Sequence, residues 1–122
     1  MEMKVSEGAD GVTSIMLDGR FDIAGAQQVD AQFNAVAERS KALIIDLTKV
    51  SFIASLGVRT LMMSAKSLIR RGGEMAVCGA NENVEKVLRM TGFNEVAGIY
   101  PDYFSAADAL RARAAEFGSR KA

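Results

Sequence analysis

An unbroken apolar run near the middle of the chain, Leu43-Ile44-Ile45, constrains the fold more than any other feature. A strand that is apolar at every position must be buried on both faces, which is typical of a parallel strand covered by helices. Downstream, apolar residues recur at helical spacing and end at the pair Gly72-Gly73, which predicts a helix with a glycine C-cap. The stretch therefore predicts a central strand followed by a helix, with Ser55 at their junction.

The remaining patterns indicate a single α/β domain. Strands that alternate with helices imply parallel pairing through right-handed crossovers, while the tight-turn pair Asp10-Gly11 predicts an antiparallel hairpin at the N-terminus. We expect Gly19 to form a turn and Asp22 and Asn81 to cap helices. The predicted elements are strands at 3–8, 12–17, 43–47, 74–79 and 97–100, a link from 48 to 54, and helices at 23–40, 55–71, 82–91 and 105–117, the last opened by a capping box of Ser105 and Asp108.

The predicted helix after Ser55 has two different faces. The stripe expected to face the sheet comprises Val58, Leu61, Met62, Ala65, Leu68 and Ile69. The side expected to face water comprises Leu56, Arg59, Thr60, Met63, Ser67 and Arg70. Two of these outward residues, Leu56 and Met63, are apolar and lie close to Ser55. With Arg59 they predict a patch that contacts a partner, rather than isolated apolar residues on the surface.

The composition disfavours several classes of function. Lys plus Arg number 15 and Asp plus Glu number 15, so no net charge draws the protein to nucleic acid or to an anionic membrane. The chain has no histidine, which removes Ser-His-Asp triads, HExxH zinc sites and the usual general base near neutral pH. We therefore expect a protein that is not an enzyme and that needs neither a metal ion nor another cofactor.

The cysteine content and the N-terminus bear on location. The single cysteine, Cys78, cannot form an intrachain disulfide and is expected to be a small buried hydrophobic residue. The first residues lack the apolar core of a signal peptide, and no apolar run is long enough to cross a bilayer. We expect a cytoplasmic location.

Several motifs resemble, in order and spacing, those of the STAS domain, and in particular the small, free-standing bacterial anti-sigma factor antagonist. They are the early LDGRFD, the run LIIDLTKVSFIASLG and the later RRGGEMAVCGANENVEKVLRMTGF. The resemblance covers nearly the whole chain. It implies one STAS domain over residues 1–117, in which a mixed sheet, with an N-terminal antiparallel hairpin plus parallel strands, is packed with about four helices. Residues 118–122 are predicted to be a disordered tail.

The resemblance also implies a regulatory serine. In that family the second helix begins with Asp-Ser-Ser-Gly or Asp-Ser-Thr-Gly, and a serine kinase that is also the anti-sigma factor phosphorylates the first hydroxyl residue. Here the positions read Ala54-Ser55-Leu56-Gly57, so the acceptor serine and the glycine match, whereas the aspartate and the second hydroxyl residue do not. The implied function is an antagonist that binds the anti-sigma factor until Ser55 is phosphorylated, with a serine phosphatase as a further partner. The implied partner-binding residues are Ser55, Leu56, Gly57, Arg59, Thr60 and Met63.

One alternative remains open for this site. Ser55 can be an N-cap that accepts a backbone N–H bond and has no regulatory role. The chain is then a STAS interaction or scaffold subunit of a transporter or a signalling assembly, without phosphorylation. The residues that favour this alternative are Ala54 and Leu56, which depart from the family pattern.

Other polar residues of the central stretch are weaker candidates. Asp46 suggests a receiver phosphoaspartate, but a receiver needs an acidic pair after its first strand and this chain has none there. We expect Asp46 to order the loop that follows it. Thr48 and Ser51 are backup phosphorylation candidates, although neither lies at the start of the helix.

Overall fold

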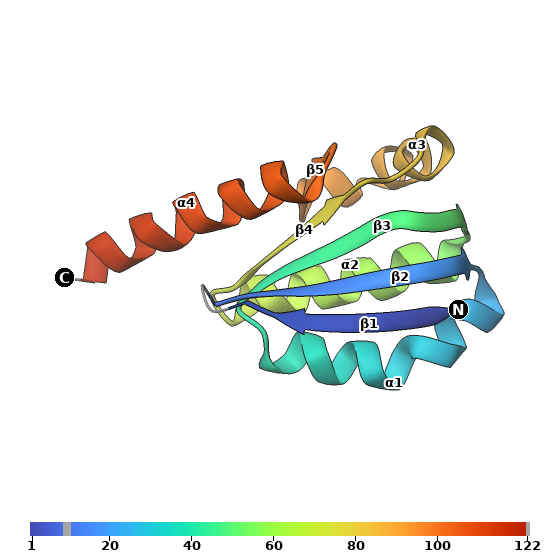
Figure 1. Ribbon diagram of the computed structural model, residues 1–122, viewed down its shortest axis with the longest axis horizontal. Coiled ribbons are helices and arrows are strands. Elements are labelled where there is room, and N and C mark those ends of the chain that lie inside the picture. The colour runs from blue at the N-terminus through green and yellow to red at the C-terminus, as the bar shows by residue number, and fades with distance from the viewer. Residues whose placement is uncertain (9–10, 122) are drawn as a thin grey trace.

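In the computed structural model, the chain forms a five-stranded mixed sheet with helices on both faces (Figure 1). The structure describes residues 1–8 and 11–121, with side chains for residues 1–8 and 11–112. The strands lie side by side in chain order: β1 (Glu2–Glu7), β2 (Val12–Phe21), β3 (Ala42–Ile53), β4 (Glu74–Cys78) and β5 (Gly98–Tyr100). The helices are α1 (Ile23–Arg39), α2 (Ser55–Arg70), α3 (Glu82–Met90), the 3-10 helix η1 (Phe93–Glu95) and α4 (Tyr103–Lys121). The predicted mixed sheet is confirmed, because β1 and β2 pair antiparallel and the other neighbours pair parallel.

β3 lies between two apolar layers. On one face of the sheet, Leu43 and Ile45 pack in a core that also contains the buried faces of α1, α2 and α3. On the other face, Ile44 packs with the first turns of α4, including Leu110. Alternate side chains of a strand point to opposite faces, so helices on both sides bury all three residues completely. The prediction of a central strand buried on both faces is confirmed.

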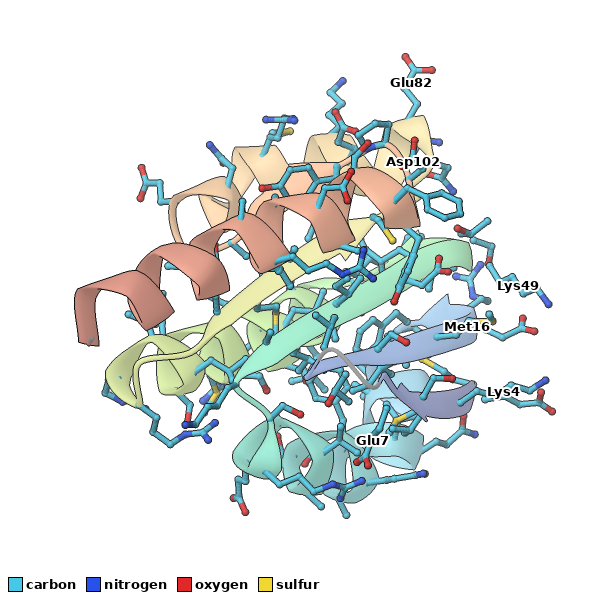
Figure 2. All side chains as sticks on the ribbon, turned by 60° about the vertical axis from the view of Figure 1, so that its left-hand side comes forward. Lys4, Glu7, Met16, Lys49, Glu82 and Asp102 are labelled. Carbon is cyan, nitrogen blue, oxygen red and sulfur yellow. The ribbon has the colours of Figure 1, made fainter. Side chains whose placement is uncertain are left out.

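α4 covers only part of its face of the sheet. Beyond it, Lys4 of β1, Met16 of β2 and Lys49 of β3 lie together on the uncovered surface (Figure 2). Glu2 and Asp18 line the same shallow area. A polar face exposed to water is common where a sheet pairs antiparallel, and these mixed charges suit it.

β3 is longer than the sequence predicted. A link was predicted over residues 48–54, but the strand continues to Ile53 because its second half pairs with residues 18–21 of β2. The predicted turn at Gly19 is instead part of β2, which is irregular there: the register shifts on both sides of residues 18–19. Pairing with a distant strand overrode the local turn signals.

The caps predicted for two helices are confirmed. The Asp22 carboxylate accepts a hydrogen bond of 2.8 Å from the backbone N–H of Gly25 at the start of α1. The Asn81 side chain accepts a hydrogen bond of 2.8 Å from the N–H of Val84 at the start of α3. α2 ends at Arg70, and Arg71 is its C-cap residue. The next residue, Gly72, has a φ of +79°, which is the left-handed conformation expected after a helix.

The start of α4 differs from the prediction. The capping box of Ser105 and Asp108 is wrong, because the helix already begins at Tyr103 and Asp102 caps it. The Asp102 carboxylate accepts a hydrogen bond of 2.8 Å from the backbone N–H of Ser105, and this bond holds the pKa of Asp102 below its usual value. An aspartate directly after Pro101 was the local signal for this cap.

Some predictions fall at the margins of the described chain. The predicted hairpin turn includes residue 10, which lies outside the described residues, as does residue 122. α4 extends to Lys121, past the predicted end at residue 117, and the disorder of residues 118–122 stays a prediction. Within the described residues, no helix combines the length and the hydrophobicity that a membrane span requires.

Candidate partner-binding site

Ser55 is exposed at the first position of α2. The backbone N–H of the preceding residue, Ala54, donates a hydrogen bond of 2.9 Å to the carbonyl oxygen of Phe21, so the start of α2 is attached to the end of β2. The Ser55 hydroxyl forms no hydrogen bond within the part of the chain that the structure describes. The Ser55 hydroxyl is therefore accessible at the electropositive end of this helix.

The N-cap of α2 is Ala54 and not Ser55. Ala54 has the extended backbone of a cap residue, with φ −100° and ψ 170°, and no side chain caps the first turn. The alternative in which Ser55 serves only as an N-cap is therefore wrong. The first-turn N–H groups of α2 lack the side-chain acceptor that most helix starts provide.

Gly57 lies buried against the end of β2. A Cβ atom at this position would lie 2.7 Å from the carbonyl oxygen of Phe21 and 3.1 Å from Cγ1 of Ile53. Only a residue without a side chain allows the first turn of α2 to come this close to the sheet. Gly57 thus contributes by placing Ser55, and its own surface is covered.

The faces of α2 differ from the prediction at several positions. Thr60 was expected to face water, but it is 9% exposed and its hydroxyl donates a hydrogen bond of 3.1 Å to the carbonyl oxygen of Leu56. Ile69 was expected in the inner stripe, but it is 50% exposed. The inner positions that are confirmed as buried are Val58, Leu61, Ala65 and Leu68, while Met62 is half-buried. α1 packs along one side of α2, which shifts the buried face toward Thr60.

A groove between α1 and α2 runs beside the serine. It has a volume of about 230 Å³ and is lined by Leu56, Arg59, Thr60 and Met63 of α2 and by Asp30 and Asn34 of α1. Of the predicted partner-binding residues, Ser55, Arg59 and Met63 are exposed, Leu56 is half-buried, and Gly57 and Thr60 are buried. Asp30 and Asn34 were not among the predicted site residues. Their spacing marks one exposed face of α1, but only helix packing brings that face next to α2.

A second exposed group lies at the ends of β2 and β3. The guanidinium carbon of Arg20 lies 4.5 Å from the centroid of the Phe52 ring, in cation–π contact, and Arg20 also pairs with Asp22 at 3.4 Å. Phe52 and Ile23 are large apolar residues that remain 40% and 61% exposed. Since β2 pairs with β3 as far as Phe21 and Ile53, this group lies at the edge of the sheet from which α1 and α2 begin.

Asp46 and Cys78 play structural parts. One Asp46 carboxylate oxygen accepts hydrogen bonds from the N–H of Thr48 at 2.9 Å and from its hydroxyl at 2.6 Å. Asp46 therefore orders the next residues as predicted, but these residues belong to β3 and not to a loop. Burial, with smaller effects from the charges of Asp46 and Asp102, raises the pKa of the Cys78 thiol to about 12. Within residues 1–8 and 11–112, no three Cys, Asp or Glu side chains are grouped to hold a metal ion.

The fold and the site define a class of protein: a small α/β domain that presents a free serine at the start of its second helix, next to a groove. A family model of the STAS domain matches residues 3–106, so the chain belongs to the STAS domain family. The resemblance seen in the sequence is thereby confirmed.

The relatives include proteins of known class. The chain is 29% identical over 98 residues to the anti-sigma F factor antagonist of Paenibacillus polymyxa. The aligned residues cover 79% of this chain and 84% of that protein. The crystal structure of an anti-sigma factor antagonist from Mycobacterium paratuberculosis superposes with a TM-score of 0.82 at 25% identity, covering 90% of this chain and 93% of that one. The phosphorylated form of SpoIIAA, a Bacillus cell fate determinant, has a TM-score of 0.69 at 17% identity over 88% of this chain and 98% of that one, which shows a shared fold.

Proposed function

We propose that this chain is an anti-sigma factor antagonist that captures an anti-sigma factor while Ser55 is unmodified. In this proposal the anti-sigma factor is also a serine kinase, which ends the binding by phosphorylating Ser55. The observation that carries the proposal is the exposed Ser55 hydroxyl at the start of α2, without a hydrogen-bond partner in the described chain. The class of partner is taken from the relatives that are named anti-sigma factor antagonists.

Phosphorylation at this position is compatible with the fold. A phosphoserine carries a charge of about −1.5 to −2 at neutral pH, which the positive end of a helix dipole favours. In the transfer, the Ser55 oxygen forms a bond to the γ-phosphorus of ATP as the bond to ADP breaks, and the hydroxyl proton passes to a base of the kinase. A serine phosphatase removes the group by hydrolysis: the oxygen of a water molecule bonds to phosphorus as the bond to the Ser55 oxygen breaks, which restores the hydroxyl and releases inorganic phosphate. α2 can therefore accept the group without unfolding.

The phosphate would oppose capture through its charge. Half-buried Leu56 follows Ser55 directly, and Met63, on the same side of α2, is 58% exposed. A partner that covers these apolar side chains must also remove water from a phosphate dianion, which is costly unless the partner supplies a cation. Binding can thus be lost with no change in the fold, and this chain itself performs no catalytic step.

A STAS interaction subunit without phosphorylation is the second candidate. The observation that favours it is the pair of departures around the serine: Ala54 offers no carboxylate to orient the hydroxyl, and Leu56 adds apolar surface in place of a second hydroxyl. In that case the same surface binds a partner permanently.

The two candidates are separated by one set of experiments. The tagged chain is used to capture its partner from the cells that express it, and the purified partner is then incubated with the chain and ATP-Mg²⁺. Intact mass should show one added phosphoryl group, which Ser55→Ala abolishes. Ser55→Asp should weaken binding to the partner at least about tenfold, roughly 1.4 kcal/mol, while Ser55→Ala binds like the wild type.

Ser51→Asp is the matched control, because Ser51 is an exposed serine of the neighbouring strand β3. It should leave binding unchanged. A captured anti-sigma factor that adds no phosphate to Ser55 favours the permanent interaction subunit. A partner of another class removes the antagonist assignment altogether.

A further inference from the structure

Two side chains of opposite charge line the groove between α1 and α2 without pairing. Asp30 lies on α1 and Arg59 on α2, and both are exposed. Neither forms an ion pair within the described part of the chain. The Asp30 carboxylate accepts one hydrogen bond there, of 3.3 Å from the side-chain amide of Asn34. The two walls of the groove therefore offer an incoming molecule one anion and one cation, neither of which is held in an ion pair within the described residues.

Apart from Asn34, whose side-chain amide donates to Asp30, the lining between these charges is apolar in effect. Leu56 and Met63 contribute hydrocarbon and thioether surface, and Met63 is 58% exposed. The one hydroxyl of the lining, on Thr60, already donates to the carbonyl oxygen of Leu56. An apolar strip flanked by one positive and one negative side chain is complementary to an amphipathic helix, which carries apolar residues on one face and charges at its borders.

We propose that this groove binds one amphipathic helix of the anti-sigma factor, with an acidic side chain against Arg59, a basic side chain against Asp30 and an apolar side chain over Leu56 and Met63. This inference rests on the proposed function and adds the recognition element of the partner. The occupant follows from charge complementarity and from continuity with Ser55, since Leu56 is the next residue in the chain.

The same arrangement ties recognition to modification. Arg59 lies four residues after Ser55 on α2, and residues at this spacing are neighbours on one face of a helix. A phosphate on Ser55 is thus within reach of the cation that holds the partner's acidic residue. The phosphoserine competes with the partner for Arg59, in addition to its cost of desolvation.

Charge-reversal variants test the groove. Binding of the unmodified chain to the purified anti-sigma factor is measured by calorimetry for Arg59→Glu, for Asp30→Lys and for the double variant. Each single reversal should weaken binding about tenfold or more, and the double variant should bind weakest, because each charge then faces a like charge of the partner. Thermal unfolding of each variant checks that the domain is folded.

The matched control is another exposed pair of one acidic and one basic residue, Glu82 and Lys86, four positions apart on α3. Glu82 points away from the sheet in Figure 2. Glu82→Lys and Lys86→Glu should bind like the wild type. A double variant that restores wild-type affinity would mean that Asp30 and Arg59 act on each other, which overturns the inference. Single reversals that bind like the wild type overturn it as well, while capture itself still supports the antagonist function. Failure of the unmodified wild-type chain to bind any anti-sigma factor overturns both.

Discussion

The backbone N–H of Ala54 lies 2.9 Å from the carbonyl oxygen of Phe21, to which it donates a hydrogen bond. Phe21 is the last residue of β2, one position before the Asp22 cap of α1, and Ala54 is the cap residue of α2. The two helices that form the groove therefore begin on either side of one hydrogen bond. The sheet therefore holds the start of both helices, and this fixes the position of the groove relative to Ser55.

Replacement of Gly57 by alanine should destabilise the domain. Alanine is favoured over glycine inside a helix by about 1 kcal/mol, so propensity alone predicts a gain. The new Cβ atom would lie 2.7 Å from the carbonyl oxygen of Phe21, however, and a clash with backbone typically costs about 1–3 kcal/mol. Urea unfolding should show a net loss. Lys66→Ala, at an exposed position of the same helix, should change stability by less than about 0.5 kcal/mol, and a more stable Gly57→Ala would contradict the close approach.

Replacement of Ala54 by aspartate should stabilise α2. Ala54 holds the N-cap position with no side-chain acceptor, and an aspartate there can accept an N–H bond of the first turn. The expected gain is about 1 kcal/mol in the free energy of unfolding at neutral pH. Ala54→Leu, which adds bulk without an acceptor, serves as the control. An equal gain in both variants would show that the first turn has no unmet need for a cap.

The stability conferred by Asp22 should depend on pH. The hydrogen bond from the N–H of Gly25, assisted by Arg20, lowers the pKa of Asp22 in the folded state. The contribution of the Asp22 carboxylate to stability is therefore complete above its pKa in the unfolded chain, about 3.9, and is lost as the pH falls through its lower pKa in the folded protein. The difference in Tm between the wild type and Asp22→Ala should shrink on acidification below about pH 4.

Asp22→Asn supplies the control for this titration. Asparagine is also a good N-cap but does not ionise, so the difference in Tm between Asp22→Asn and Asp22→Ala should stay constant with pH. A constant difference between the wild type and Asp22→Ala down to about pH 3 would contradict the lowered pKa.

Cys78 should resist thiol reagents in the folded protein. The thiolate is the reactive form, and burial raises the pKa of this thiol to about 12 while leaving the side chain 1% exposed. A chromogenic disulfide reagent should label the native chain only at the rate of unfolding and should label it at once in denaturant. Cys78→Ser should remove the signal, and rapid labelling of the native wild type would contradict the burial.

Local sequence signals predicted the helix starts well. Asp22 and Asn81 cap helices because their short side chains reach the N–H three residues later, an interaction that needs no other part of the chain. Ser55 was placed at the start of α2 by the change from a strand pattern to a helical one. The start of α4 was predicted at the wrong residue because two nearby residues, Asp102 and Ser105, are both good caps, and local signals alone do not decide between them.

The length of β3, by contrast, could not be predicted from local sequence signals. Residues 48–54 alternate poorly and were predicted as a link, yet most of them form a strand through pairing with residues 18–21 of β2. The burial of Thr60 and the exposure of Ile69 likewise depend on where α1 packs against α2. These features come from contacts between segments far apart in the chain, which a local pattern does not encode.

The amino-acid sequence by itself determined the mixed α/β fold, the family and the residue that lies at the start of α2, because periodicity, caps and motif order are properties of short segments. Only the tertiary structure decided which neighbours that residue has. The free hydroxyl of Ser55, the alanine at the cap, and the groove with Asp30 opposite Arg59 exist because β2 pairs with β3 and α1 packs on α2. Helix packing brings together residues about thirty positions apart, and no local signal specifies that distance.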